Sequence, residues 1–423
     1  MGEVVKGDSL RGKKMKKVAI CVPTHNHPEV VGDVLAKSIN NYANRDIDVY
    51  YLDSSTNSDT QEVIEQYQRG GYKNIYYKKV PPTCGVEEKV LKFFEREDFS
   101  EEYQYIWPVK DRVYFSVDTI DRVLEDIEHD YDVILLGAMP PQGRPDIFTK
   151  EYTEASTFYR DWAWQATSLD VVLYNVQTML SDFSVAEFKK KYKQDYNIYW
   201  CTIVLLFNEL AEKRQVSIKL FRDAALGIYA SPLGKSSWKK ETFKIWKDYW
   251  ISVNLELPSC YDEYKLFVIK DAASLPWIMG STEELIRLYK IGALSKENFE
   301  MVSTNWELVS DVPVSTLKDI AYGKYNVFHD ISSVKKQVDE FTELLIGVVE
   351  MIKLDQIDKM AIPFEEIARY LTTKGINKIH RNKLNLLLGS IKDVEVFIKK
   401  EDVSKEEIVK AMQIIINMLV LLD

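Results

Sequence analysis

The sequence of 423 residues predicts an α/β fold, in which a mostly parallel sheet is flanked by helices and followed by an all-helical C-terminal part. Three observations lead to this fold class. Short apolar runs alternate with segments of helical spacing between residues 17 and 137. Polar loops follow these runs, and helical patterns dominate after Lys239. Strands that alternate with helices along a chain are typical of parallel sheets.

The expected elements follow in chain order. The first strand, at 17–23, ends in proline and precedes a helix over 29–39, whose apolar residues recur every three or four positions. Further strands are expected at 47–53, 73–79, 103–109 and 131–137, and further helices after the polar cluster 54–60 through Gln68, at 85–96 and at 117–127. Ligands bind such sheets outside the C-terminal ends of the strands, so the loops at those ends are expected to form the site.

The second half of the sequence predicts mainly helices. A strongly apolar helix is expected over 198–213 and a strand over 216–221. Ser281 and Ser404 each stand three residues before a glutamate, as in a capping box. The expected divisions are a disordered tail at 1–16, an α/β domain at 17–250, a helical extension at 251–335, and a bundle of amphipathic helices at 336–423.

Composition limits the classes of partner and compartment. The net charge of −10 gives no general basic field for nucleic acid. Cys21, Cys84, Cys201 and Cys260 form no C-x-x-C pair, so we expect free buried thiols in a reducing compartment. No signal peptide precedes the first strand, and the longest apolar run, 414–422, is too short to span a bilayer. A cytoplasmic protein is expected, with peripheral membrane association left open.

Two nucleotide-binding motifs are absent. The first strand is not followed by G-x-G-x-x-G, which disfavours a dinucleotide-binding Rossmann site. The chain also has no G-x-x-x-x-G-K-[ST], which excludes a P-loop. An anionic nucleotide would therefore bind through other loops.

The loops after the first two strands resemble those of GT-A glycosyltransferases of family 2. The first loop, Pro23-Thr-His-Asn26, is similar to the family's P-x-Y-N, with histidine in place of tyrosine. The second, Asp53-Ser-Ser-Thr-Asn-Ser-Asp-Thr60, is similar to its D-[DG]-x-S-x-D-x-T. The resemblance covers about residues 17–250. It implies that Pro23, His25 and Asn26 pack on a uracil ring, and that Asp53 accepts a hydrogen bond from uracil or ribose.

The resemblance extends to the diphosphate. Gly85 and Lys89 stand where the family has a glycine followed by a basic residue, which implies that Lys89 neutralises phosphate charge. The family's D-x-D appears here as Val109-Lys110-Asp111, without its first aspartate. The second aspartate typically holds a divalent metal, so Asp111 is the expected ligand of Mn²⁺ or Mg²⁺. Lys110 adds positive charge beside it and could replace part of the metal's effect.

Two further regions are candidates. Asp195 stands at about the family's distance beyond Asp111 for a general base, in competition with Asp161, Asp182 and Glu187. The loop Lys235-Ser236-Ser237 after Gly234 has the charge and the hydroxyl donors to close over a diphosphate. Aromatic faces in the expected acceptor region could stack on a sugar or be ordinary core: Tyr159, Trp162 and Trp164.

The expected activity is transfer of a hexose or N-acetylhexosamine from a UDP-sugar to a hydroxyl of a glycan or glycoprotein acceptor. The resemblance implies inversion at the anomeric carbon and a role in bacterial surface glycoprotein or polysaccharide synthesis. A nucleotidyltransferase would want a Gly-rich basic loop after the first strand, and the residues after Pro23 supply none. A non-catalytic GT-A-like scaffold remains the alternative, with the apolar last helix mediating homo-oligomerisation.

Overall fold

The computed structural model describes residues 16–95, 102–137, 151–222, 226–228 and 237–324. The chain divides into two compact units, 1–322 and 323–423. The elements below all belong to the first unit. The expected tail (except Lys16), the bundle at 336–423 and the Ser404 capping box lie outside the described residues.

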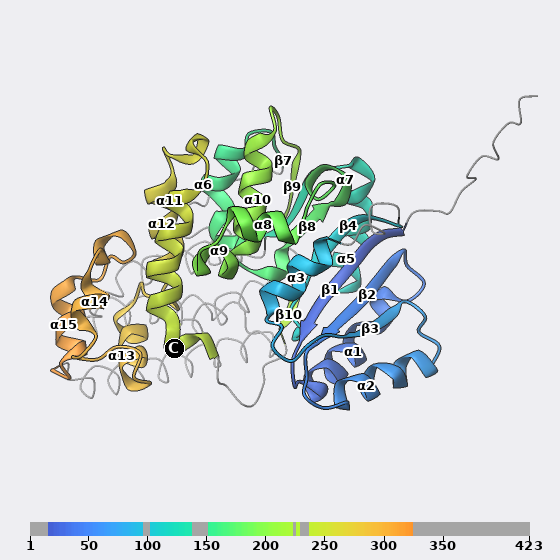
Figure 1. Ribbon diagram of the computed structural model, residues 1–423, viewed down its shortest axis with the longest axis horizontal. Helices are drawn as coiled ribbons and strands as arrows, with labels where there is room; N and C mark the ends of the chain where they lie inside the picture. The colour runs from blue at the N-terminus through green and yellow to red at the C-terminus, as the bar shows by residue number, and fades with distance from the viewer. Residues whose placement is uncertain (1–15, 96–101, 138–150, 223–225, 229–236, 325–423) are drawn as a thin grey trace, which may run out of the picture. The chain divides into compact units, whose positions relative to one another are not determined.

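The first half of the described chain alternates strands and helices, as expected (Figure 1). In order, the elements are β1 (Lys16–Thr24), α1 (Pro28–Tyr42), β2 (Ile47–Asp53), α2 (Asp59–Arg69), β3 (Ile75–Lys79), α3 (Val86–Phe94), β4 (Tyr103–Pro108), β5 (Val113–Phe115), α5 (Val117–Asp126), η1 (Ile127–His129) and β6 (Val133–Gly137). β1 pairs in parallel with both β2 and β4, and β2 pairs in parallel with β3. The register sets Thr24 opposite Asp53 and Cys21 opposite Pro108, so these strands end at a common edge.

The complete sheet is mixed, with strand order β3-β2-β1-β4-β8-β6-β9-β7. Its remaining strands are β7 (Glu151–Tyr152), β8 (Val172–Asn175) and β9 (Ile218–Arg222), and β10 (Leu226–Ile228) pairs with β5 in a separate ribbon. β8 runs antiparallel to both β4 and β6, and β7 runs antiparallel to β9. The sequence did not predict β7 and β8, because strands of two and four residues are too short to show a period.

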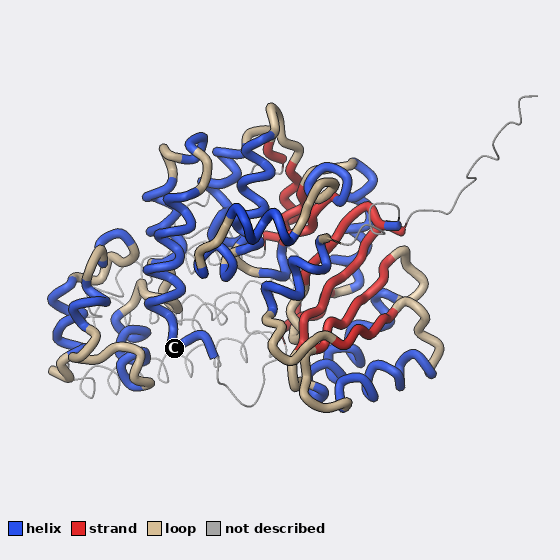
Figure 2. The backbone as a smooth tube through the Cα atoms, viewed as in Figure 1, coloured by secondary structure: helices blue, strands red, loops and turns tan. Residues whose placement is uncertain are grey.

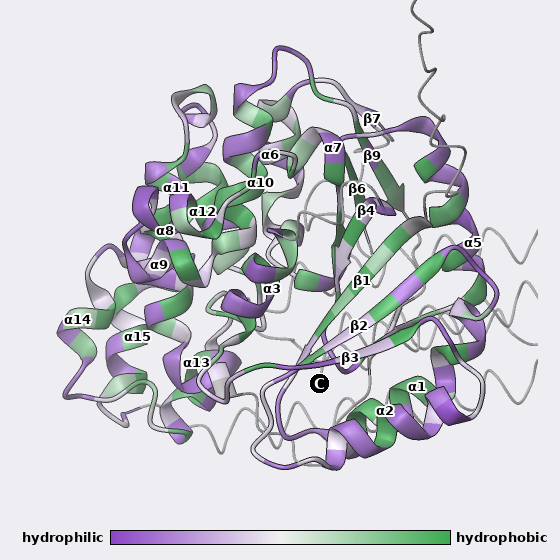
Figure 3. Cartoon of the chain, turned by 45° about the vertical axis from the view of Figure 1, so that its right-hand side comes forward, coloured by the Kyte–Doolittle hydropathy of each residue, from purple (hydrophilic) through white to green (hydrophobic). Residues whose placement is uncertain are grey.

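The sheet is buried because helices cover both faces. All seven residues of β2 and all five of β6 are buried, as parallel strands require. α1 packs against α2 and α5, whereas α3 packs against β1 and α10. Figure 3 colours β1 mostly hydrophobic, while β2, α1 and α2 show both hydrophobic and hydrophilic residues.

Helices dominate the second half of the described chain (Figure 2). They are α6 (Ala155–Ala166), η2 (Leu169–Val171), α7 (Val176–Met179), α8 (Val185–Lys191), α9 (Asp195–Tyr199), α10 (Cys201–Glu212), η3 (Ser237–Glu241), the π-helix η4 (Lys244–Tyr249), α11 (Trp250–Glu256), η5 (Ser259–Tyr261), α12 (Lys265–Ala273), α13 (Thr282–Lys290), α14 (Phe299–Ser303), η6 (Trp306–Leu308) and α15 (Val314–Ala321). The helix expected at 198–213 begins instead at Cys201, because Trp200 leaves the helical region with φ −99° and ψ 31°.

The structure bears on two further expectations, which concern membrane-spanning segments and the cysteines. No helix in the described ranges is both long and apolar enough to cross a membrane. The four cysteines are free thiols, as expected, but only Cys21, Cys84 and Cys201 are buried, and Cys260 is exposed. Cys260 lies in η5, where the neighbouring Tyr261 is the side chain that enters the core, at 0% exposure.

Of the expected capping box at Ser281, the serine cap is present, whereas the Glu284 carboxylate pairs with Lys239 and Arg287. The serine cap gives a test of the local structure. Ser281 Oγ accepts a hydrogen bond from the Glu284 backbone N–H at 3.1 Å. We expect Ser281→Ala to lower the free energy of unfolding by about 1 kcal/mol, because one N–H at the start of α13 loses its partner. Urea denaturation would measure this change. Ser58→Ala is the matched control, since Ser58 occupies the N-cap of α2 without a side-chain cap bond. Equal losses in both variants would contradict the capping assignment.

Candidate functional site

The candidate site lies where β1, β2 and β4 end. Ser54 N–H, just after β2, donates to Thr24 O at 3.2 Å, and Val109 N–H, just after β4, donates to Cys21 O at 2.8 Å. The strand pairing therefore continues into the loops. The loop after β1 sits between the other two, and polar side chains from all three loops meet.

The loop after β1 is held against the loop after β2 by its histidine and asparagine. Asn26 adopts φ 53°, a left-handed conformation that asparagine tolerates. Its backbone N–H donates to Ser55 Oγ at 2.7 Å, and its Oδ1 accepts from Thr56 N–H at 3.1 Å. His25 Nδ1–H donates to Ser54 O at 2.9 Å, which leaves Nε2 to accept from Asn26 Nδ2 at 3.0 Å. Both side chains are exposed at the strand edge, whereas Pro23 is buried within β1.

Asp53, at the end of β2, lies beneath this surface with 0% of its area exposed. Its Oδ1 accepts from Ser55 N–H at 2.8 Å and also from the Ser55 hydroxyl. Its Oδ2 accepts from Tyr77 OH at 2.8 Å and from Lys79 Nζ at 3.3 Å. Burial opposes the charged form, but the bonds from Ser55 and Tyr77 and the charge of Lys79 lower the pKa of Asp53. The carboxylate thus stays ionised and orders the groups around it.

The two oxygens of Asp111, after β4, differ in their hydrogen bonds to the described residues. Oδ2 accepts from Thr24 Oγ1 at 2.9 Å and from His27 Nδ1 at 2.9 Å. Oδ1 makes no hydrogen bond to any described residue, although Asp111 is only 7% exposed. The described residues contain no group of three or more His, Cys, Asp or Glu side chains that could hold a metal. The protein thus offers one carboxylate oxygen here, which fits a cation only if other oxygens complete its shell.

His27 was not singled out by the sequence analysis. Its side chain is 46% exposed. The hydrogen bond to Asp111 raises the pKa of His27, while burial and the charge of Arg112 oppose the shift. The parallel pairing of β1 with β4 could have indicated His27 as a site residue, because two adjacent parallel strands bring their C-terminal loops together.

Lys89 is buried beneath the same edge, at 1% exposure. Its Nζ donates to Thr24 O at 2.6 Å, which ties α3 to the end of β1. Burial lowers the pKa of Lys89, while the charges of Asp53 and Asp111 oppose that shift. Gly85 is the N-cap of α3 in an ordinary extended conformation, with φ −69° and ψ 174°. The ammonium therefore acts on the site from below, through its charge.

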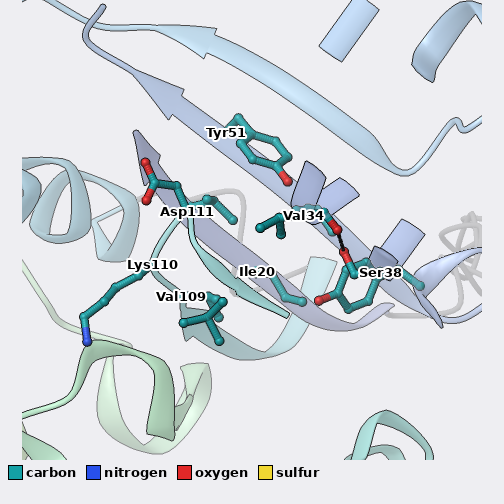
Figure 4. A pocket seen from close by; sticks show the side chains of 11 residues that line it. Ile20, Val34, Ser38, Tyr51, Val109, Lys110 and Asp111 are labelled. Carbon is teal, nitrogen blue, oxygen red and sulfur yellow. Dashed lines mark hydrogen bonds between the residues drawn. The ribbon is translucent and has the colours of Figure 1, made fainter. Parts of the chain in front are cut away.

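Lys110 points away from Asp111. Its Nζ lies 2.9 Å from Asp170 Oδ2 and 3.0 Å from Ser168 Oγ, and its backbone N–H donates to Asp170 Oδ1 at 2.6 Å. Figure 4 shows the two side chains pointing in different directions at one side of a small pocket. The pocket is lined mainly by core residues: Ile20, Val22, Val34, Ser38, Tyr42, Val49, Tyr51, Val109, Lys110, Asp111 and Val113. The paired ammonium fixes the loop after β4 to η2, the turn just before β8.

The expected general base, Asp195, is the exposed first residue of α9. Lys244 of η4 is among its electrostatic neighbours. Of the competing acids, Asp161 is 3% exposed and pairs with Arg160 at 2.7 Å. Asp182 and Glu187 are exposed. No described contact joins Asp195 to the strand edge.

The remaining expected site residues are the phosphate loop at 235–237 and the three aromatic residues of the expected acceptor region. Lys235 and Ser236 lie outside the described residues, and Ser237 begins η3 with its side chain outside them. Tyr159 and Trp162 are both 0% exposed, so the structure favours the core interpretation for them. Trp164 is half-buried, and its indole N–H has no hydrogen-bond partner within the described part of the chain.

The comparisons give structural neighbours but no sequence relatives. No protein-family model matches the chain, and no curated protein matches it in sequence. Solved structures do match. The crystal structure of S. aureus TarS 1–349 is 13% identical with a TM-score of 0.43, and the match covers 72% of this chain and 90% of that one.

Two further neighbours have bound ligands. Mannosyltransferase PcManGT from Pyrobaculum calidifontis, with GDP-Man and Mn²⁺, is 10% identical with a TM-score of 0.40, covering 73% of this chain and 85% of that one. Glucosyl-3-phosphoglycerate synthase from Mycobacterium tuberculosis, with Mn²⁺, UDP and glucosyl-3-phosphoglycerate, is 10% identical with a TM-score of 0.33, covering 52% and 74%. The expected α/β fold class is confirmed by the sheet and its flanking helices, and the proposal below rests on the sheet order and the strand-end loops of this chain.

The His27–Asp111 pair predicts a pH dependence. We expect an NMR titration of His27 in metal-free buffer to have its midpoint above 6.5, and to fall in Asp111→Asn. Since the folded-state pKa is the raised one, the stabilisation from this pair is fully present below pH 6.5 and is lost as pH rises through the folded-state value. His27→Gln assigns the signal. An unchanged midpoint in Asp111→Asn would show that the pair does not form in solution.

Proposed function

We propose that this protein transfers a hexose or N-acetylhexosamine from a UDP-sugar to a hydroxyl of a glycan acceptor, with inversion. One observation carries the proposal. The loops after β1, β2 and β4 meet at one sheet edge, where they present exposed His25 and Asn26 beside a carboxylate with a free oxygen. The crevice outside the C-terminal ends of parallel strands is where α/β sheets bind nucleotides.

The nucleoside would bind over the loop after β1. The hydrogen bonds of both ring nitrogens fix the His25 ring at the exposed loop, where its face can stack on a base. Pro23 would support that loop from within β1. Asp53 would act as a positioning residue, because it orders Ser55, Tyr77 and the half-exposed Lys79 around the place expected for ribose.

The diphosphate would lie beside Asp111. A Mn²⁺ or Mg²⁺ held there by Oδ1, with phosphate and water oxygens completing its shell, would neutralise the charge that develops on the leaving UDP. Gly85 begins the helix whose Lys89 adds positive charge from below. Lys110 would hold the Asp111 loop in place through Asp170. Lys235, Ser236 and Ser237 are proposed to close over the phosphates.

The acceptor hydroxyl would attack the anomeric carbon from the face opposite UDP. Asp195 is proposed to take the proton of that hydroxyl as the new C–O bond forms and the bond to the UDP oxygen breaks. Acceptors of bacterial surface glycoprotein or polysaccharide synthesis suit this activity, and a cytoplasmic location, peripheral to the membrane, is proposed with them.

A non-catalytic GT-A-like scaffold is the second candidate. Val109 stands in place of the first aspartate, and the described residues form no cluster of three metal ligands. Both features would suit a chain that has lost turnover and assembles homo-oligomers. Donor hydrolysis or transfer distinguishes the two candidates directly.

The donor site predicts a selective thermal shift. We expect UDP to raise the melting temperature more than GDP, CMP or ADP, and Mn²⁺ to increase the UDP effect. Asp111→Asn should abolish the Mn²⁺-dependent part and lower turnover by about a hundredfold or more, because charge on the leaving group loses its compensation. Asp118→Asn is the control, an exposed acid on α5. No response to any nucleotide would favour the scaffold.

The base assignment predicts a loss of turnover without loss of donor binding. Asp195→Asn should lower the rate of transfer by about 10²- to 10⁴-fold, since an amide cannot take the proton. The UDP thermal shift should stay unchanged. Glu283→Gln is the matched control, because Glu283 is also an exposed acid in the first turn of a helix. Full activity of Asp195→Asn would assign the base elsewhere.

A further inference from the structure

A continuous cluster of aromatic rings joins α9, η4 and α11, outside the strand-end site. We call it the aromatic shelf; its members are Tyr196, Tyr199, Trp200, Trp246, Tyr249 and Trp250. The ring centroids of Trp200 lie 5.1 Å from those of both Trp246 and Trp250. Tyr249 lies 6.0 Å from Tyr199 and 6.2 Å from Tyr196.

The shelf is layered. Trp200 and Trp250 are 6% and 0% exposed and form its base. Tyr199, Trp246 and Tyr249 are only half-buried. Aromatic rings that stay partly in water as a group form an amphipathic surface, with apolar faces and polar edges. The indole N–H groups of Trp200 and Trp250 have no hydrogen-bond partner among the described residues, which is a cost that an ordinary core avoids.

The π-helix η4 carries two rings of the shelf and leads into the helix that carries a third. η4 covers Lys244–Tyr249 and continues directly into α11, so Trp246, Tyr249 and Trp250 come from adjoining turns. π-helical turns inside helices are rare and frequently mark functional sites. α9 packs against both η4 and α11, and Asn197 Nδ2 donates to Glu256 Oε2 at 2.9 Å. The shelf is thus held on rigid elements.

Acidic groups border the shelf. Burial, followed by the charges of Glu87 and Glu241, raises the pKa of Tyr199 to about 12. Lys244 Nζ lies 5.1 Å from the Tyr249 ring centroid, and its electrostatic neighbours include Glu241 and Asp195. Carboxylates outnumber ammonium groups among these neighbours. Such a border accepts hydrogen bonds from hydroxyls and repels anionic chains.

Glu87 connects the shelf to the strand-end site. It lies in the first turn of α3, two residues before Lys89, which bonds to Thr24 O at the end of β1. α3 also packs against α10, the helix that follows α9. α3 therefore links the surroundings of the shelf to the end of β1.

We propose that the aromatic shelf binds the pyranose rings of a neutral glycan, the acceptor of the transfer proposed above, on which this inference rests. The apolar faces of Tyr199, Trp246 and Tyr249 stack on the C–H faces of sugars, and the bordering carboxylates accept their hydroxyl protons. This assigns the acceptor class as uncharged sugar polymer rather than phosphate-bearing polymer. The core residues Tyr159 and Trp162 take no part, since both are fully buried.

The test is a binding panel on the full chain. Chitopentaose, cellopentaose and maltopentaose serve as neutral probes, and inorganic polyphosphate serves as the anionic probe, each titrated by calorimetry with and without UDP. We expect at least one neutral glycan to bind and polyphosphate not to bind. Trp246→Ala should weaken glycan binding about tenfold or more, because a stacking face is removed. Trp277→Ala is the matched control, as its indole is 43% exposed and lies outside the shelf.

Conservative variants separate stacking from folding. Tyr249→Phe keeps the ring and should keep glycan binding, whereas Tyr249→Ala should lower it. The UDP thermal shift should be the same in all these variants. Failure of every neutral glycan to bind, preference for polyphosphate, or equal effects of Trp246→Ala and Trp277→Ala would overturn the shelf assignment. Glycan binding that depends on Trp246, without any response to UDP, would support the shelf and overturn the proposed donor.

Discussion

The buried Lys89 ammonium is the constraint on which the site depends. A cation with 1% exposure is costly unless compensating groups surround it. Thr24 O provides its hydrogen bond, and the nearby charges of Asp53 and Asp111 provide the compensation. The same interaction fixes α3 against the end of β1. Removing the carboxylate of Asp53 or of Asp111 would therefore destabilise the charged form of Lys89 and, through it, the end of β1. The loops at the sheet edge thus depend on one another.

The sequence predicted the part of the fold in which local pattern and tertiary structure agree. The strand–helix alternation through β6 is found within a few residues, because those strands are apolar runs and those helices have clear periodicity. It did not predict β8, whose direction is set by its pairing with β4 and β6 rather than by its four residues. The antiparallel strand at the centre of the sheet is a long-range feature.

The sequence predicted which loops form the candidate site better than it predicted how each side chain is buried and bonded there. The loops carrying His25, Asn26 and Asp111 do meet, since adjacent parallel strands end together. Burial could not be predicted, so Asp53 and Lys89 lie beneath the surface they were expected to form. The partner of Lys110, Asp170, is 60 residues away in the chain. The aromatic shelf needed the π-helix, which no periodicity in the sequence indicated.

Because of the π-helix, the aromatic shelf can change its geometry without any change at the sheet edge. A π-helical turn holds one residue more than an α-helical turn would, so the loss of a single residue from η4 would restore α-helical winding. Each residue in a helix turns the next side chain by about 100°. One deletion would thus reorient Trp246 relative to Tyr199 while leaving β1, β2 and β4 untouched. In evolution, single-residue deletions or insertions in η4 could therefore alter the aromatic shelf while the loops at the sheet edge stay the same.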